Sequence, residues 1–256
     1  MEGYLELSNY TCHYKTIGSP KSQDSFWIFL HEGLGSIPQW KGFPEQLCRH
    51  SGRPGLLFER NGYGRSTAPG KKRPKDFLHR EAFDALPEIL QKLNLNGPQH
   101  IFGHSDGATI GLLYASRQPE KLKTVIAVAP HVFLEDVSVK GIARTRKAFL
   151  DGKLKGGLEK YHAPHTDNVV LSWTDYWLNP INSDWNMFDD LLKITAPVLF
   201  IQGNRDMYGT LQQGEEIKRR VQGGYDSLTL ENGGHNPHFE YPYEVMTKSM
   251  SFSGVK

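Results

Sequence analysis

The sequence has few cysteines, almost no charge imbalance and no long apolar run. Its 256 residues include two cysteines, Cys12 and Cys48, which excludes a disulfide-rich scaffold and predicts two free thiols in a reducing compartment. Lysine and arginine number 30 against 28 aspartates and glutamates, a formal net charge of +2, so nothing favours nucleic acid as a partner. The N-terminal residues lack the apolar core of a signal peptide, and no apolar run approaches the ~20 residues that cross a bilayer. We therefore expect a cytoplasmic protein that binds neither nucleic acid nor membrane.

Short apolar runs alternate with helical patterns along most of the chain. Continuous runs such as 26–30 (FWIFL) suit strands that are buried on both faces of a sheet. Helices are expected over 40–49 and 76–95, where apolar residues recur at helical spacing. This alternation predicts an α/β fold with a mostly parallel sheet covered by helices on both faces. The expected strands are 4–8, 10–16, 26–30, 56–58, 100–102, 125–129, 198–201 and 228–230.

The alternation stops between residues 130 and 195. This segment has helical patterns, no convincing buried strand, and many aromatic and histidine residues. We therefore predict a core of residues 1–130 and 195–256 with a helical lid, residues 131–194, inserted over the sheet. His162, His165 and Asp167 have a spacing that metal sites also use, but we assign them a structural role. The basic run Lys71-Lys72-Arg73-Pro74-Lys75 is interpreted as a solvated loop.

The chemistry is predicted to centre on the segment Ile101 to Ile110. Gly103-x-Ser105-x-Gly107 matches a strand–turn–helix motif that exposes a nucleophilic serine. Glycines two residues either side of the serine remove Cβ atoms that would collide in so tight a turn. An ordinary glycine-rich turn whose serine caps the following helix can have the same sequence pattern. The context favours the nucleophile, because an apolar strand precedes the motif and a helical pattern follows it.

A serine hydroxyl needs a base, and imidazole with a carboxylate partner is the usual one. In parallel sheets, ligands bind beyond the carboxyl ends of the strands, so the partners should follow strands downstream of Ser105. Asp206 lies in the loop after the strand 198–201, although it could instead cap the following helix. His235 directly follows the last strand and a pair of glycines, which allow an unusual backbone path. His238 is the competing candidate for the base.

An acyl-transfer intermediate also needs N–H donors for its oxyanion. One is expected to be the backbone N–H of Asp106, directly after the serine. The second should come from the loop after the strand 26–30, with Gly33 preferred over Leu34. A plain glycine turn is the alternative interpretation of that loop.

Together these features resemble the α/β-hydrolase superfamily, within it the lidded esterase and carbon–carbon-bond hydrolase branch. The likeness covers nearly the whole chain and includes the Arg60-x-Gly62-x-Gly64-x-Ser66 turn. It implies a sheet of about eight strands, no metal and no organic cofactor. It also implies Ser105 as nucleophile, Asp206 as acid and His235 as base. Haloalkane dehalogenases and epoxide hydrolases carry aspartate at the position of Ser105, so the chain differs from both.

Two carboxylates depart from the family pattern. The oxyanion loop, often His-Gly in the family, is here His31-Glu32-Gly33, and Asp106 follows the nucleophile. A carboxylate beside a developing oxyanion is unfavourable unless it is neutralised or turned away. We therefore expect Glu32 and Asp106 to be paired outside the pocket, with Arg60 or Arg65 as candidate partners, or Glu32 to be simply exposed to solvent.

The sequence thus predicts a carboxylesterase-like serine hydrolase that cleaves a small-molecule ester. Residues expected to line its substrate pocket are His131, Phe133, Trp173 and Trp177. Alternatives on the same three residues are a thioesterase, a pimeloyl-carrier-protein methyl ester esterase and a carbon–carbon-bond hydrolase. Cofactor-free oxygenase or perhydrolase chemistry would use them too. A ligand sensor with slow turnover is the alternative outside enzyme chemistry.

Overall fold

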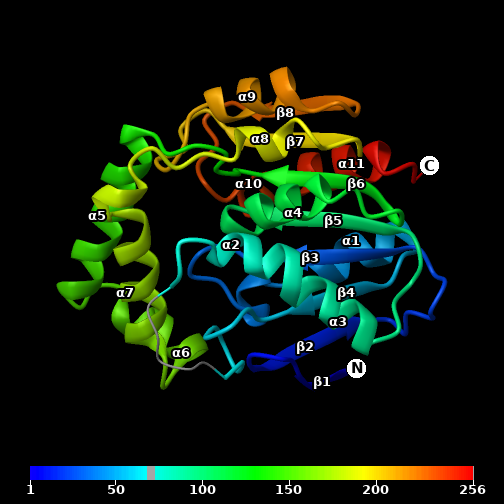
Figure 1. Ribbon diagram of the computed structural model, residues 1–256, viewed down its shortest axis with the longest axis horizontal. Helices are drawn as coiled ribbons and strands as arrows, with labels where there is room; N and C mark the ends of the chain where they lie inside the picture. The colour runs from blue at the N-terminus through cyan, green and yellow to red at the C-terminus, as the bar shows by residue number, and fades with distance from the viewer. Residues whose placement is uncertain (68–72, 256) are drawn as a thin grey trace.

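The computed structural model describes residues 1–67 and 73–255, which contain one eight-stranded sheet (Figure 1). The strand order is β1-β2-β4-β3-β5-β6-β7-β8. β2 pairs antiparallel with β1 and β4, and all other neighbours are parallel, which confirms the predicted mostly parallel sheet. The strands are β1 (Glu2–Glu6), β2 (Thr11–Ile17), β3 (Phe26–Leu30), β4 (Gly55–Phe58), β5 (Gln99–His104), β6 (Leu122–Val128), β7 (Val198–Gly203) and β8 (Tyr225–Leu230).

Burial along the strands follows their place in the sheet. Every residue of β3, β4, β5 and β7 is buried, as expected for inner strands with helices on both faces. The edge strand β1 instead alternates between exposed and half-buried residues. The continuous apolar runs of the sequence therefore mark the inner strands, and the weaker patterns mark the edges.

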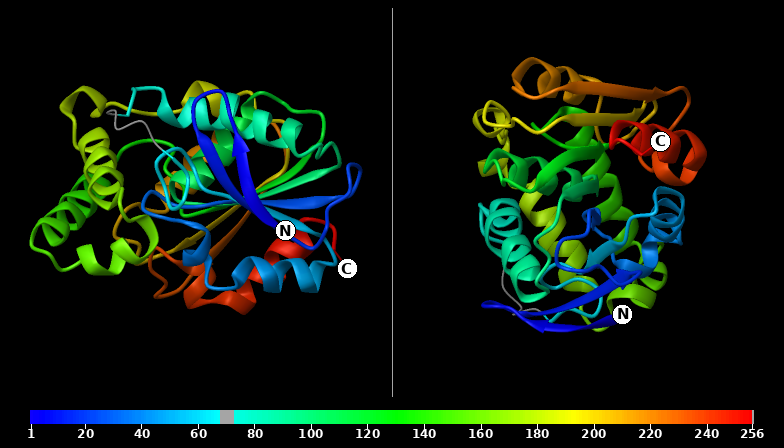
Figure 2. Two further views of the ribbon diagram at one scale, coloured as in Figure 1. Left: turned by 90° about the horizontal axis from the view of Figure 1, so that it is seen from below. Right: turned by 90° about the vertical axis from the view of Figure 1, so that its right-hand side faces the viewer.

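Helices cover both faces of the sheet (Figure 2). One apolar cluster joins the sheet to α1 and α11, and a second joins its other face to α2, α3, α4 and α9. The helix bounds are α1 (Phe43–Ser51), α2 (Phe77–Arg80), α3 (Leu86–Lys92), α4 (Asp106–Ser116), α9 (Gln212–Arg220), α10 (Pro237–Glu240) and α11 (Pro242–Phe252).

Two expected helices differ in detail from the structure. The helix expected from residue 40 begins only at Phe43, because Gly42 precedes it with a φ of 83° and Trp40 ends a separate 3-10 turn, Ile37–Trp40. The helix expected over 76–95 contains a π-helical turn, Glu81–Ala85, between α2 and α3. Apolar spacing predicts a helix, but it does not predict a one-residue change of winding within it.

The segment expected to form a lid is helical, and its helices α5, α6 and α7 lie to the left in Figure 1. Its short helix α8 packs against α4 and α9 of the core. The limits 131–194 of the lid stay a prediction. Its elements are α5 (Asp136–Leu150), α6 (Lys155–His162), α7 (Thr166–Trp177), the 3-10 turn Pro180–Asn182 and α8 (Phe188–Leu191).

His162 links α6 to two loops of the core. Its Nδ1 accepts the backbone N–H of Gly64 at 3.0 Å, and its Nε2 donates to the carbonyl oxygen of Leu34 at 2.9 Å. Both ring nitrogens are therefore used in packing, which confirms the structural role assigned to this histidine.

Cys12 and Cys48 are free and buried, which confirms the prediction of two unpaired thiols. Burial raises the pKa of each thiol to about 12. In the described part of the chain, no helix combines the length and the apolar character needed to cross a membrane.

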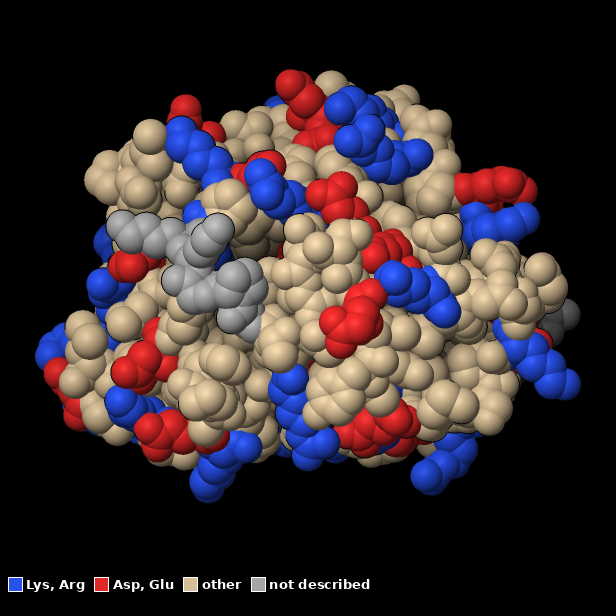
Figure 3. All heavy atoms as spheres, turned by 60° about the horizontal axis from the view of Figure 1, so that its bottom comes forward, with Lys and Arg blue, Asp and Glu red and all other residues tan. Residues whose placement is uncertain are grey.

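Charge is distributed without segregation over the face shown in Figure 3, where acidic and basic side chains lie interspersed. This pattern agrees with the nearly balanced composition. Lys71 and Lys72 of the basic run lie outside the described residues.

Candidate active site

Ser105 stands at the turn between β5 and α4, in a strained backbone conformation with a φ of 52° and a ψ of −121°. A Cβ atom at Gly103 would overlap the backbone of Gly107 and Ala108, and one at Gly107 would overlap the carbonyl oxygen of Leu30. The steric need for both glycines is thereby confirmed. The serine side chain makes no helix-capping hydrogen bond, so the simple cap is not what this turn contains.

The three residues proposed as a triad lie in one hydrogen-bonded row. Nε2 of His235 is 3.1 Å from Oγ of Ser105, and Nδ1 of His235 is 2.8 Å from Oδ2 of Asp206. Asp206 lies in the loop after β7 and His235 in the loop after β8. Parallel strands bring these loops to the same edge of the sheet, so residues 130 positions apart become neighbours.

The row has a defined proton arrangement. A carboxylate oxygen can only accept, so Nδ1 of His235 carries the proton and Nε2 faces the serine as an acceptor. Burial raises the pKa of Asp206, but the charge and hydrogen bond of His235 outweigh it and the pKa is lowered. The backbone N–H of Tyr208 also donates to Oδ1 of Asp206 at 2.8 Å. Asp206 is therefore held as the anion that an imidazolium needs beside it.

His238, the competing candidate for the base, lies elsewhere. It is 2% exposed, and its ring packs among Trp40, Phe43 and Phe102, which belong to the apolar cluster that joins the sheet to α1 and α11. Burial lowers the pKa of His238 well below its ordinary value.

The two glycines before His235 were expected to adopt an unusual backbone conformation, but the structure uses them for close packing instead. The left-handed backbone falls on Asn232, with a φ of 62°, while no such angle occurs at Gly233 or Gly234. A Cβ atom at Gly203 would overlap the backbone of Gly233 and Gly234. Lack of side chains thus lets the loop after β8 lie directly on the end of β7, which brings His235 to Asp206.

The oxyanion loop is oriented by Arg60. The carbonyl oxygen of Glu32 accepts hydrogen bonds from Arg60 Nη2 at 2.6 Å and from the backbone N–H of Gly35 at 3.1 Å. In a trans peptide the N–H points opposite to the carbonyl, so the N–H of Gly33 faces away from Arg60. The N–H of Asp106 is the first of α4 and has no partner within that helix. Their use as oxyanion donors stays a proposal.

Asp106 is paired, as expected, with Arg60. Its Oδ2 lies 3.7 Å from Arg60 Nη1 and accepts the indole N–H of Trp173 at 3.1 Å. Arg60 and Asp106 are each 1% exposed. Arg65, the other expected partner, instead reaches the exposed Glu2 at 3.0 Å. The carboxylate after the nucleophile therefore has a cation and an indole N–H as partners.

For Glu32, the expected arginine partner was wrong. Its carboxylate lies 3.7 Å from Nδ1 of His104, whereas Arg60 binds only its main-chain oxygen. The side chain is 28% exposed, so it is not freely solvated either. His104 also donates from Nε2 to the carbonyl oxygen of His235 at 2.7 Å. Glu32 is thus linked through His104 to the loop that carries the proposed base.

Glu32 gives the protein an acid-sensitive element. Burial would raise the pKa of Glu32, but the close approach and charge of His104 lower it to about 2 from an ordinary 4.5. Because the folded state holds this proton less tightly than the unfolded state, the stabilisation is complete above about pH 4.5 and is lost as pH falls toward 2. We expect the Glu32→Gln variant to lose less stability than the wild type between pH 5 and pH 3. Urea unfolding across that range measures this, and parallel pH curves for the two proteins would contradict it.

The residues expected to bind substrate lie at different distances from the row. The His131 ring centroid is 6.2 Å from that of His235, and Trp177 lies 6.1 Å beyond His131. The indole of Trp173 covers Gly33, because a Cβ atom there would overlap it. The ring of Phe133 packs against Phe188 at 5.9 Å. The roles of all four residues stay predictions.

Two further residues of the site had no signal in the sequence. The ring of Tyr208 lies 4.6 Å from that of His235 and forms one wall of the site. Gln202 donates from Nε2 to the carbonyl oxygen of Gly209 at 2.8 Å, which holds the loop that carries Asp206. Tyr208 lies two residues after Asp206 and Gln202 four residues before it, and this closeness in the chain did not by itself indicate a role.

The fold defines the class of this protein: it has the α/β-hydrolase fold. A family model for the alpha/beta hydrolase fold matches residues 27–153. The crystal structure of MGS-M2, an alpha/beta hydrolase from a Medee basin deep-sea metagenome library, superposes with a TM-score of 0.81 at 14% identity, covering 99% of this chain and 98% of that one. The crystal structure of the enol-lactonase from Burkholderia xenovorans LB400 superposes with a TM-score of 0.76 at 16% identity. The superposition covers 98% of this chain and 99% of that one. The family model spans just under half of this chain, and the two superpositions show the α/β-hydrolase fold over nearly all of it.

The sequence relatives have names that describe different activities. The bifunctional biotin biosynthesis protein BioHC of Teredinibacter turnerae is 26% identical over 91% of this chain and 45% of its own length. A proline iminopeptidase of Lactobacillus delbrueckii is 25% identical over 49% of this chain and 42% of its own length. Human serine hydrolase BPHL is 24% identical over 74% of this chain and 65% of its own length. The matches span less than half of the first two relatives.

Proposed function

We propose that this chain is a serine hydrolase that cleaves a carboxylic ester of a small or medium acyl substrate through an acyl-enzyme. The observation that carries the proposal is the hydrogen-bonded row from Ser105 through His235 to Asp206. The three residues come from three separate loops, and chance would seldom produce that order and those distances together. The name of the human relative, serine hydrolase, agrees with this assignment.

The proposed reaction follows from the proton arrangement. His235 takes the proton of Ser105 at Nε2 as the hydroxyl oxygen attacks the ester carbonyl. The backbone N–H groups of Gly33 and Asp106 hold the oxyanion. The proton on Nε2 then passes to the departing alcohol, which leaves the acyl group on the serine. Water, deprotonated by His235, attacks the acyl-enzyme and releases the acid.

We also propose that residues 131–194 act as a lid. Ser105 is only 3% exposed, and Trp173 from α7 covers the oxyanion loop and donates to Asp106. A substrate therefore needs α7 to move before it can reach the hydroxyl. The indoles of Trp173 and Trp177, both from α7, support an acyl group that is largely apolar.

Turnover of p-nitrophenyl esters of increasing chain length tests this proposal. We expect repeated turnover on acetate or butyrate esters, falling for long chains. A matched thioester and a carbon–carbon ring-cleavage substrate separate the rival hydrolases, and added peroxide tests perhydrolase chemistry. A single slow release of p-nitrophenol per molecule, with no further turnover on any substrate, would contradict the enzyme and favour a ligand sensor.

A further inference from the structure

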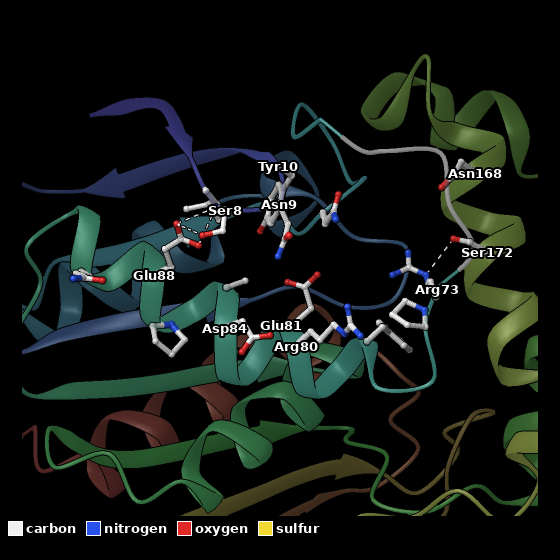
Figure 4. A pocket seen from close by; sticks show the side chains of 17 residues that line it. Ser8, Asn9, Tyr10, Arg73, Arg80, Glu81, Asp84, Glu88, Asn168 and Ser172 are labelled. Atoms are coloured by element: carbon white, nitrogen blue, oxygen red, sulfur yellow. Dashed lines mark hydrogen bonds between the residues drawn. The ribbon is translucent and has the colours of Figure 1, made fainter.

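A pocket lies apart from the proposed active site. It encloses about 850 Å³ between the β1–β2 turn, the π-helical turn and α7 (Figure 4). None of Ser105, Asp206 and His235 lines it. The pocket therefore calls for an explanation of its own.

The pocket is bounded by buried polar groups that lack partners. Glu81 and Tyr10 are 9% and 8% exposed, and among the described residues Oε2 of Glu81 and the hydroxyl of Tyr10 have no hydrogen-bond partner. The same holds for Oδ1 of Asn61. Figure 4 shows Glu81 pointing from its helix into the space below Asn9 and Tyr10. Oδ1 of Asn61 and Oε2 of the ionised Glu81 can only accept hydrogen bonds, so each of these two atoms lacks a donor.

The cations of the pocket are already engaged. Arg73 donates from Nε to Oγ of Ser172 at 3.1 Å, and also to the hydroxyl of Tyr63. Arg80 donates from Nε to Oδ2 of Asp76 at 2.9 Å. Of the acids, Glu88 accepts the backbone N–H of Ser8 at 3.0 Å. Arg73 and Arg80 therefore already have partners, whereas Oε2 of Glu81 and Oδ1 of Asn61 still lack a donor.

Apolar residues also line part of the pocket. They come from α2, α3, the π-helical turn and two loops, and they suit the hydrocarbon body of a ligand. These lining residues are Leu7, Pro74, Phe77, Ala85 and Pro87.

We propose that this pocket binds a protonated primary amine with an apolar or aromatic body. An ammonium group has three N–H donors and no acceptor, which matches Glu81, Asn61 and the hydroxyl oxygen of Tyr10. The body of the amine lies against Phe77 and its apolar neighbours. The proposal does not depend on the chemistry at Ser105.

The electrostatics of Glu81 agree with a cationic ligand. Burial raises the pKa of Glu81, and the charges of Arg60 and Arg73 only partly oppose this. A bound ammonium would add a positive charge in direct contact with this buried carboxylate. The π-helical turn begins at Glu81, and such turns are frequent at functional sites.

Titration calorimetry of the full chain with phenethylammonium chloride at pH 7 tests the inference. We expect saturable binding, with phenethyl alcohol and 3-phenylpropionate each at least about tenfold weaker. Glu81→Gln should weaken the amine about tenfold or more, and the milder Tyr10→Phe should weaken it less. Glu120→Gln, an exposed acid elsewhere, and Ser105→Ala should leave it unchanged.

Three results would overturn the inference. The first is no amine binding to the wild type, and the second is tighter binding of the anion. The third is amine binding that survives both Glu81→Gln and Tyr10→Phe in variants whose unfolding midpoints match the wild type. If Glu81→Gln fails to fold, Tyr10→Phe alone decides between the outcomes.

Discussion

Replacing Ser105 with alanine is expected to reduce p-nitrophenyl ester hydrolysis by about 10⁴-fold or more. The reason is that alanine removes the proposed nucleophile, while the proposed oxyanion donors remain and supply only residual catalysis. The effect should fall on kcat, because the hydroxyl forms its decisive bond in the transition state. Steady-state kinetics of the purified variant measure this.

Ser116→Ala is the matched control for that variant. Ser116 is also buried on α4, where its hydroxyl donates to the carbonyl oxygen of Leu113 at 2.7 Å. Its loss should cost some stability and little activity. Activity that persists in Ser105→Ala within tenfold of the wild type would show that another group attacks the ester.

Replacing His235 with glutamine is expected to lower kcat by about 10⁴-fold, with folding retained. Glutamine still offers a polar group near Asp206, but it cannot take the proton of Ser105 at neutral pH. The loss should ease at high pH, where hydroxide replaces the missing base. Kinetics between pH 7 and pH 10 test both statements.

His238→Gln separates the two histidines. His238 is buried among aromatic rings on the opposite face, so its replacement should reduce stability and leave most of the activity per folded molecule. If the losses were reversed, with His235→Gln active and His238→Gln inactive, the proposed row would be wrong.

The sequence alone predicts the inner strands of the sheet and the turn that carries Ser105. β3 and β7 are continuous apolar runs, and each ends where a loop must begin, so their edges could be located closely. The turn at Ser105 could also be predicted, because its steric demand for glycine is local and visible within five residues. Local steric requirements of this kind produce a recognisable sequence motif.

Side-chain partners that are brought together by tertiary packing have no such motif in the sequence. Trp173 donates to Asp106 from a helix 67 positions away, and nothing in either segment specifies the other. The partner of Glu32 was sought among arginines, but the fold brings His104 to it instead. The π-helical turn at Glu81 and the left-handed Asn232 depend on how neighbouring elements pack, which apolar spacing does not record.

Covalent capture of the nucleophile tests the central claim most directly. After brief incubation with an alkyl fluorophosphonate, intact-mass and peptide analysis should show one adduct per chain, located on Ser105. The adduct should form far more slowly in His235→Gln and be absent in Ser105→Ala. An unmodified wild-type chain, or an adduct on another residue that forms at equal rate in all three proteins, would contradict the account.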